Sequence, residues 1–225
     1  MSIEPESYQS FVNEEFPPVL QALLPEALKR AYEQVRQLMG DTSFLSTEGA
    51  QKTSGYLIQD SVDYQLIQLI HTGKLPFDFT WDSHARPTGK HLKLLPKNTV
   101  ITVNQLQQAK QFPRHASFRN NQRINNKDPQ MLLFKNDPQD ALDDLRGRPH
   151  LVLGHGYQDL NFACIYVPHS HKKQWNWRTP NLLNLPHSLS SDLPPVEQYT
   201  NDTEPTIKEE FLEWRRETHG NSNRN

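Results

Sequence analysis

The sequence predicts an α+β fold with amino-terminal helices, a central antiparallel sheet with hairpins, and a carboxy-terminal helix. Two observations carry this prediction: apolar residues recur every three or four positions before residue 73, and alternate every second position after residue 76. With 225 residues, of which 35% are hydrophobic and 22% charged, the chain has enough apolar material for one lean core. We therefore expect a single domain over 16–171, helical over 16–73 and mainly strand over 74–171.

Two helices are expected in the amino-terminal part. The first lies within 17–41, where one apolar face contains Leu20, Leu24, Leu28, Ala31, Val35 and Leu38. Pro25 starts a new helix or kinks this one, and Gly40 is the expected stop. The second covers 60–73, with an apolar stripe at Val62, Leu66, Leu69 and Ile70 and with Gly73 at its end. Residues 1–15 are polar and terminal, so we expect a flexible tail there.

Five segments are typical of strands, because they alternate apolar and polar residues or are rich in β-branched and aromatic ones. They are FDFTW (77–81), KHLKLL (90–95), TVITV (99–103), HLVLGHGY (150–157) and LNFACIYV (160–167). The short turn PKN joins the second to the third, and Gln158 and Asp159 join the last two, so each pair predicts a hairpin.

Three further segments complete the expected organisation. A short helix is expected over 137–147, where Asp137 precedes Pro138. Residues 172–204 are rich in proline, serine and asparagine and predict an extended arm. Residues 205–219 then predict a terminal helix, with Trp214 on its apolar face.

Charge is distributed unevenly along the chain. The formal net charge is −2, yet Ser83 to Lys127 contain nine lysines and arginines and no acid, which leaves a net of −11 elsewhere. Such a basic segment attracts phosphate backbones, which release counterions when they bind. The predicted nucleic-acid-binding residues within it are Arg86, Lys90, Lys93, Lys97, Arg114, Arg119, Asn120, Arg123 and Lys127.

The principal hypothesis is therefore a cytoplasmic nucleic-acid-binding protein, for DNA or RNA, of a regulatory, toxin–antitoxin or defence system. A first alternative is a small RNase or nuclease that acts on the strand bound at the basic segment. A second is a non-enzymatic interaction module that binds a protein partner, or a second copy of the chain, through the terminal helix. The basic segment also has a plainer interpretation, as a solvated face or a counterpart to the chain's own acids.

A few histidines are candidate catalytic or metal-binding residues. His91, His115 and His155 are the candidates for acid–base chemistry, although a turn or bulge explains the glycines around His155 better than an exposed catalytic histidine does. His169 and His171, two apart at a strand end, are the candidate metal ligands, but the adjoining lysines disfavour a cation. The Gly-Lys step in RPTGKH lacks the rest of a phosphate-binding loop, which argues against nucleotide hydrolysis. We expect no cofactor.

Cysteine content and hydropathy indicate the expected compartment. The single cysteine, Cys164, lies in an apolar run and excludes an intramolecular disulfide, which is typical of a reducing compartment. We expect it to be a buried apolar residue rather than a reactive thiol. The first residues contain acids and no basic segment of the kind that begins a signal peptide, and no apolar run approaches the ~20 residues of a membrane span. The expected location is therefore the cytoplasm, without a membrane partner.

Overall fold

A computed structural model describes residues 5–45, 47–83, 89–114, 116–126 and 147–185. The helices are α1 (Pro5–Glu15), α2 (Pro18–Gln21), α3 (Leu24–Asp41), α4 (Gln51–His71) and α5 (Ser117–Arg123). The strands are β1 (Asp78–Ser83), β2 (Lys90–Leu95), β3 (Val100–Leu106), β4 (His150–Gly156), β5 (Ala163–Pro168) and β6 (Trp175–Arg178), followed by the 3₁₀ turn η2 (Leu182–Asn184). The α+β class is therefore confirmed.

The helices α3 and α4 form a pair whose apolar residues have the expected spacing. Leu24, Leu28 and Ala31 of α3 and Val62 and Leu66 of α4 are all at most 1% exposed. Pro25 lies in the first turn of α3, where its missing N–H is harmless. The expected stop at Gly40 is one residue early, because α3 continues to Asp41.

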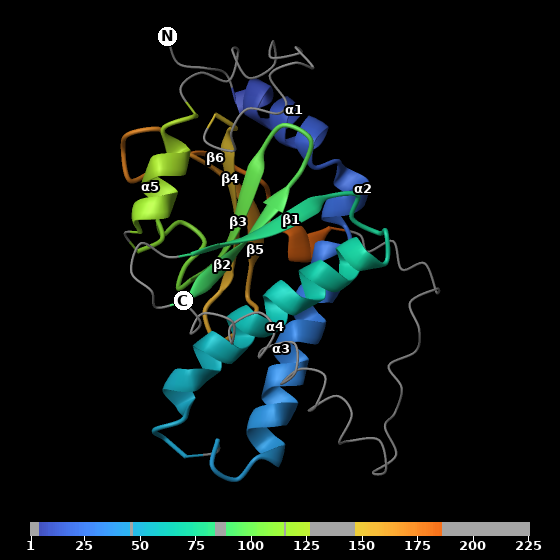
Figure 1. The fold of residues 1–225 in the computed structure, drawn as a ribbon, viewed down its shortest axis with the longest axis vertical. Coiled ribbons are helices and arrows are strands. Elements are labelled where there is room, and N and C mark those ends of the chain that lie inside the picture. The colour runs from blue at the N-terminus through green and yellow to red at the C-terminus, as the bar shows by residue number, and fades with distance from the viewer. Residues whose placement is uncertain (1–4, 46, 84–88, 115, 127–146, 186–225) are drawn as a thin grey trace, which may run out of the picture.

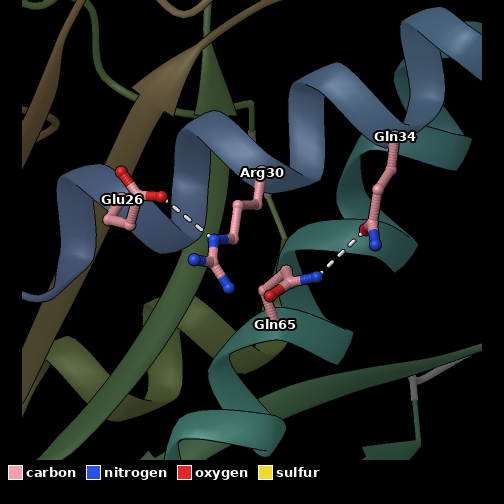
Figure 2. A network of polar contacts seen from close by, with 4 residues as sticks. All are labelled: Glu26, Arg30, Gln34 and Gln65. Atoms are coloured by element: carbon pink, nitrogen blue, oxygen red, sulfur yellow. Dashed lines mark hydrogen bonds and ion pairs between the residues drawn. The ribbon is translucent and has the colours of Figure 1, made fainter. Parts of the chain in front are cut away.

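Polar contacts lie along the outer side of this helix pair (Figure 2). The Gln34 Oε1 atom accepts hydrogen bonds from Gln65 Nε2 at 3.0 Å and from Ser61 Oγ at 3.1 Å. Arg30 Nε donates to Glu26 Oε1 at 3.0 Å within α3. The two bonds to Gln34 connect α3 to α4 at the border of the apolar seam.

The expectation of a flexible tail is wrong for residues 5–15. They form α1, whose Phe11 and Val12 are at most 3% exposed and lie in the main core. Glu15 is also buried, and its carboxylate accepts hydrogen bonds from Asn98 N, Asn98 Nδ2 and Thr99 Oγ1 at 2.9–3.1 Å. α1 is thus fixed both by apolar burial and by a carboxylate that satisfies the β2–β3 turn.

The sheet has six strands in the order β1-β2-β3-β4-β5-β6 and is mixed rather than antiparallel. Four of its pairs are antiparallel, including the two expected hairpins, but β3 and β4 are parallel, with Val100 opposite His150 and Leu106 opposite Gly156. The long connection between them, which contains α5, is what a parallel pair requires. The expected arm is also wrong at residues 175–178, which pair with β5 as β6.

The two faces of the sheet are covered differently. α3 and α4 lie on one face, and α5 lies on the other (Figure 1). On the helical face, Leu94, Ile101, Leu153 and Ile165 join the main core. A smaller apolar cluster that includes Val152, Cys164 and Tyr166 lies on the opposite face. Strand residues alternate between the two faces of the sheet. The polar residues that lie between these core residues along each strand therefore point toward α5.

Two sequence expectations fall on residues outside the described ranges: the helix over 137–147, of which only Gly147 is described, and the terminal helix over 205–219. Trp214, on which the interaction-module hypothesis depends, is among them. Within the described part of the chain, no helix has both the length and the apolar character needed to cross a membrane.

Candidate anion-binding site on the sheet face under α5

A row of polar side chains crosses the sheet on the face opposite α3 and α4. Lys93 of β2 and Thr102 of β3 are register partners, and both lie between residues that belong to the core on the other face. Thr102 Oγ1 lies 2.9 Å from Nε2 of His150, the first residue of β4. On the outer side of Lys93, its ammonium group pairs with the carboxylate of Asp82 in β1. Four neighbouring strands therefore contribute to one polar row.

Asn126, just beyond α5, connects this segment to the row. Its Oδ1 accepts a hydrogen bond from His150 N at 2.7 Å, and its Nδ2 donates to His150 O at 2.8 Å and to Pro168 O at 2.9 Å. Asn126 is 4% exposed and so replaces water for three backbone groups at the start of β4 and the end of β5. These bonds position α5 over the sheet, and with it two arginines.

Arg119 and Arg123 extend from α5 toward the sheet and its β5–β6 connection. Arg119 Nη1 donates to Oδ1 of Asn104, which is the next residue of β3 on this face after Thr102. Arg123 donates from Nη1 to Lys172 O at 2.9 Å and from Nη2 to His171 O at 3.3 Å. The guanidinium of Arg123 also lies over the Phe112 ring, 5.7 Å from its centroid.

We call Lys93, Arg119, Arg123 and His150 the basic cluster. Its cations are largely removed from water, since Arg123 is 8% exposed and the Lys93 side chain likewise 8%. Burial lowers the pKa of Arg119 to about 10, which reflects the cost of keeping that charge out of water. The carboxylate of Asp82 is 51% exposed and pairs with Lys93. Three cations thus share one face with one identified carboxylate.

His150 is close enough to these charges for them to change its pKa. Burial lowers its pKa to about 3, and the charges of Arg119, Lys93, His91 and Arg123 lower it further. The imidazole is therefore neutral at physiological pH. Its Nδ1 atom is buried and has no hydrogen-bond partner among the described residues, and the same holds for Nε of Arg123.

The other predicted binding residues do not join the cluster. Lys90 and Lys97 are exposed at the two ends of β2, and Arg114 is exposed in the loop before α5, where its carbonyl accepts from Arg119. Asn120 is half-buried in α5. Arg86 and Lys127 lie outside the described residues.

The three candidate catalytic histidines are separated by the structure. His91 is half-buried on the cluster face, opposite Asp82 in the β1–β2 register. His155 is on the helical face, where its Nδ1 lies 2.7 Å from the Tyr32 hydroxyl and burial lowers its pKa to about 3. It is not exposed by its flanking glycines: a Cβ on Gly156 would overlap Asp159 O in the tight β4–β5 turn. His115 lies outside the described residues.

The candidate metal ligands have a structural role at the β5–β6 turn. His169 Nδ1 accepts hydrogen bonds from the backbone N–H groups of His171 at 3.0 Å and Lys172 at 3.1 Å. That nitrogen is therefore occupied, and the described residues contain no group of three or more histidine, cysteine, aspartate or glutamate side chains suited to a metal. Cys164 is fully buried, and burial raises its pKa, as expected of an apolar residue rather than a reactive thiol.

His150, Thr102, Asn104 and Asp82 were not among the predicted binding residues. The alternation of β2 and β3 indicates that Lys93, Thr102 and Asn104 share a face, but nothing local in the sequence indicates that β4 lies beside β3. No family model, curated protein or solved structure matches the chain, so the site rests on its own geometry.

Proposed function

We propose that this protein binds nucleic acid, DNA or RNA, through the sheet face that carries α5. The observation that supports the proposal is the basic cluster: Lys93, Arg119 and Arg123 all come from the acid-free segment and lie on one face. In the connection between β3 and α5, Lys110 and Arg114 are exposed and available to more distant phosphates. A phosphate backbone carries charges at regular intervals, so it matches a buried cation group flanked by exposed cations better than a small anion does.

A binding assay across a salt series tests this proposal. Fluorescently labelled single- and double-stranded DNA and RNA are titrated with the protein, and the dissociation constant is followed as salt rises. We expect a logarithmic slope of roughly 0.7–0.9 per phosphate contacted. Binding that is absent for all four probes, or that does not respond to salt, would sink the proposal.

Matched variants locate the surface. Arg114→Gln with Lys110→Gln removes two exposed cations from the connection between β3 and α5, and Arg119→Gln removes one within the cluster. Arg36→Gln with Lys52→Gln removes two exposed cations from α3 and α4, on the other side of the sheet. We expect the first two changes to weaken binding and to reduce the salt slope by about one for each phosphate that is no longer neutralised, with the control unchanged. Equal weakening by both sets would assign the binding to nonspecific charge.

Strand cleavage is a second candidate function, supported by His91 and His150 on the same face as Lys93. A metal-free phosphodiesterase needs an acid, a base and cations around one phosphate. The low pKa of His150 makes it a poor proton donor at neutral pH, so His91 is the better candidate for acid–base chemistry. Incubating the same labelled strands with the protein, with and without magnesium, decides between binding alone and cleavage.

A cytoplasmic location is part of the proposal. It is supported by the single cysteine, which is buried in the small apolar cluster beside β4 and forms no disulfide with another residue of this chain. Fractionation of cells that express the full chain with a short tag measures the location directly.

A further inference from the structure

We infer that the basic cluster forms a binding site for one phosphate group, in which the Nδ1–H of His150 and the Nε–H of Arg123 donate hydrogen bonds to phosphate oxygens. We call this the phosphate seat. The identity of the molecule that carries the phosphate rests on the proposed function, whereas the seat itself rests on the contacts described below.

The hydrogen-bond chain that ends at His150 determines which ring nitrogen carries the proton. Arg119 is only a donor, so the Asn104 atom facing it is the oxygen, and the Asn104 amide nitrogen donates to Thr102 Oγ1 at 3.2 Å. If Thr102 then donates its own proton to His150 Nε2, every group from Arg119 to Nε2 is satisfied. The reverse arrangement leaves two buried groups without partners among the described residues, the Thr102 proton and the Nδ1 lone pair, and is therefore disfavoured.

His150 therefore carries its proton on Nδ1. It ends a series of hydrogen bonds in which each group, from Arg119 onward, donates to the next. Such a chain of aligned donors strengthens the last one. The Nδ1–H group is buried and lacks an acceptor among the described residues, and so does the Nε–H of Arg123. Two buried donors without acceptors on one face are unusual, because native proteins satisfy nearly all such groups.

Charge points to the same missing acceptor. The cluster holds three cations, and the one carboxylate identified beside it is that of Asp82. The two Nη atoms of Arg123 donate to neutral backbone carbonyls. Buried cations are costly unless an anion compensates them. An anion within hydrogen-bond reach of both donors would supply the missing acceptors and the missing negative charge.

Phosphate suits this site better than a carboxylate. Its oxygens point in several directions and can accept from a histidine on the sheet and from arginines on a helix above the sheet at the same time. Arginine and lysine together are the usual partners of phosphate groups. The shared chemistry is a phosphate group, whether free, on a mononucleotide, or within a nucleic-acid strand.

The test is nuclear magnetic resonance of the full chain labelled with ¹⁵N in histidine, in a buffer without phosphate or sulfate. The ring shifts of His150 report its tautomer, and we expect the Nδ1–H form before any ligand is added. Inorganic phosphate, dimethyl phosphate (a phosphodiester) and a mononucleotide are then titrated separately, with chloride at equal ionic strength as control. We expect the His150 ring signals to shift saturably with at least one phosphate probe and not with chloride, while His155 on the other face stays unchanged.

Variants refine the result without being essential to it. Lys93→Met removes a positive charge of the cluster and should weaken phosphate binding roughly tenfold. Lys52→Met, an exposed lysine of α4, should have no effect. Urea unfolding of each variant shows whether the fold is retained.

The outcomes separate this inference from the proposed function. Saturable phosphate binding at His150 without binding of any nucleic acid supports the seat and overturns the proposed function. Nucleic-acid binding that leaves the His150 signals unmoved by every phosphate probe overturns the seat. An Nε2–H tautomer in the free protein also contradicts the inference, since the buried donor is then absent.

Discussion

Acid should destabilise this protein steeply, because two histidines are buried in neutral form. His150 and His155 are at most 1% exposed, and burial lowers the pKa of each from 6.5 to about 3. In the unfolded chain both imidazoles take up a proton near pH 6.5, whereas in the folded chain neither does until about pH 3. The stability that depends on their neutral form is complete above pH 6.5 and is lost progressively as pH falls toward 3.

The magnitude follows from the two pKa values. Each histidine costs about 1.4 kcal/mol of unfolding free energy for every pH unit below 6.5. Two units of acidification, to pH 4.5, should therefore remove about 5 kcal/mol through the pair. Burial raises the pKa of Asp63, and this opposes part of the loss as pH falls. Because domains of this kind have a total stability of roughly 5–15 kcal/mol, the protein should still lose a substantial part of its stability by about pH 4.5.

Urea unfolding at half-unit steps from pH 7.5 to 5, followed by circular dichroism and tryptophan fluorescence, measures this slope. Replacing one histidine at a time, as His150→Gln or His155→Gln, should lower the slope by about 1.4 kcal/mol per pH unit, whatever the variant's stability at pH 7.5. His71→Gln, on the outer side of α4, should leave the slope unchanged. A slope below about 1 kcal/mol per pH unit between pH 6 and 5, or one unaffected by either replacement, would refute the reasoning.

Three further predictions concern packing and buried polar groups. Gly154→Ala should destabilise the protein by about 1–3 kcal/mol, because the new Cβ would lie 2.6 Å from the Tyr166 ring. Gly40→Ala in α3 should stabilise the protein by roughly 0.5–1 kcal/mol, because nothing lies within 4 Å of the new Cβ. Urea unfolding that gives both changes the same sign would contradict this. Asp63→Asn in α4 should raise stability at pH 7 and lose that advantage toward pH 4. The reason is that burial raises the pKa of Asp63 well above its usual value, so the folded state favours its protonated form. The exposed Glu33→Gln is the control, and a gain in stability that does not depend on pH would argue against this cause. Tyr32→Phe should cost about 1–3 kcal/mol, because the Tyr32 hydroxyl bonds both Gly156 O and His155 Nδ1; a thermal melt that matches the unmodified protein would mean that neither group depends on it.

Local periodicity was sufficient to predict much of the fold. The apolar stripes of α3 and α4 are set by residues close in sequence, so they indicate both the element and its buried face. The β-branched and aromatic content of β4 and β5 indicated strands, and both strands are buried along their whole length. α1 carried a comparable signal, because Tyr8, Phe11 and Val12 have helical spacing. The polar residues around them obscured that stripe. The hydrogen bonds that the Glu15 carboxylate accepts from Asn98 and Thr99 depend on tertiary contact.

The sequence predicted only part of the candidate site, because the rest depends on contacts between residues far apart in the chain. The absence of acids between residues 83 and 127 indicated Lys93, Arg119 and Arg123, and all three do lie on one face. His150 comes from a different part of the chain and reaches them through the parallel β3–β4 ladder. Sequence neighbours favour antiparallel hairpins, so a pairing across more than forty residues was not visible from local patterns.

The parallel ladder also divides the site between two halves of the chain. Helices α1 to α5 and strands β1 to β3 contribute the lysine and the arginines, while β4 to β6 contribute the imidazole. Two fragments separated anywhere between residues 126 and 147 would each hold three consecutive strands, and each would lack the chemical groups carried by the other. The site can form only when the two halves join along β3 and β4, so a ligand that bound there would report whether this central ladder has assembled.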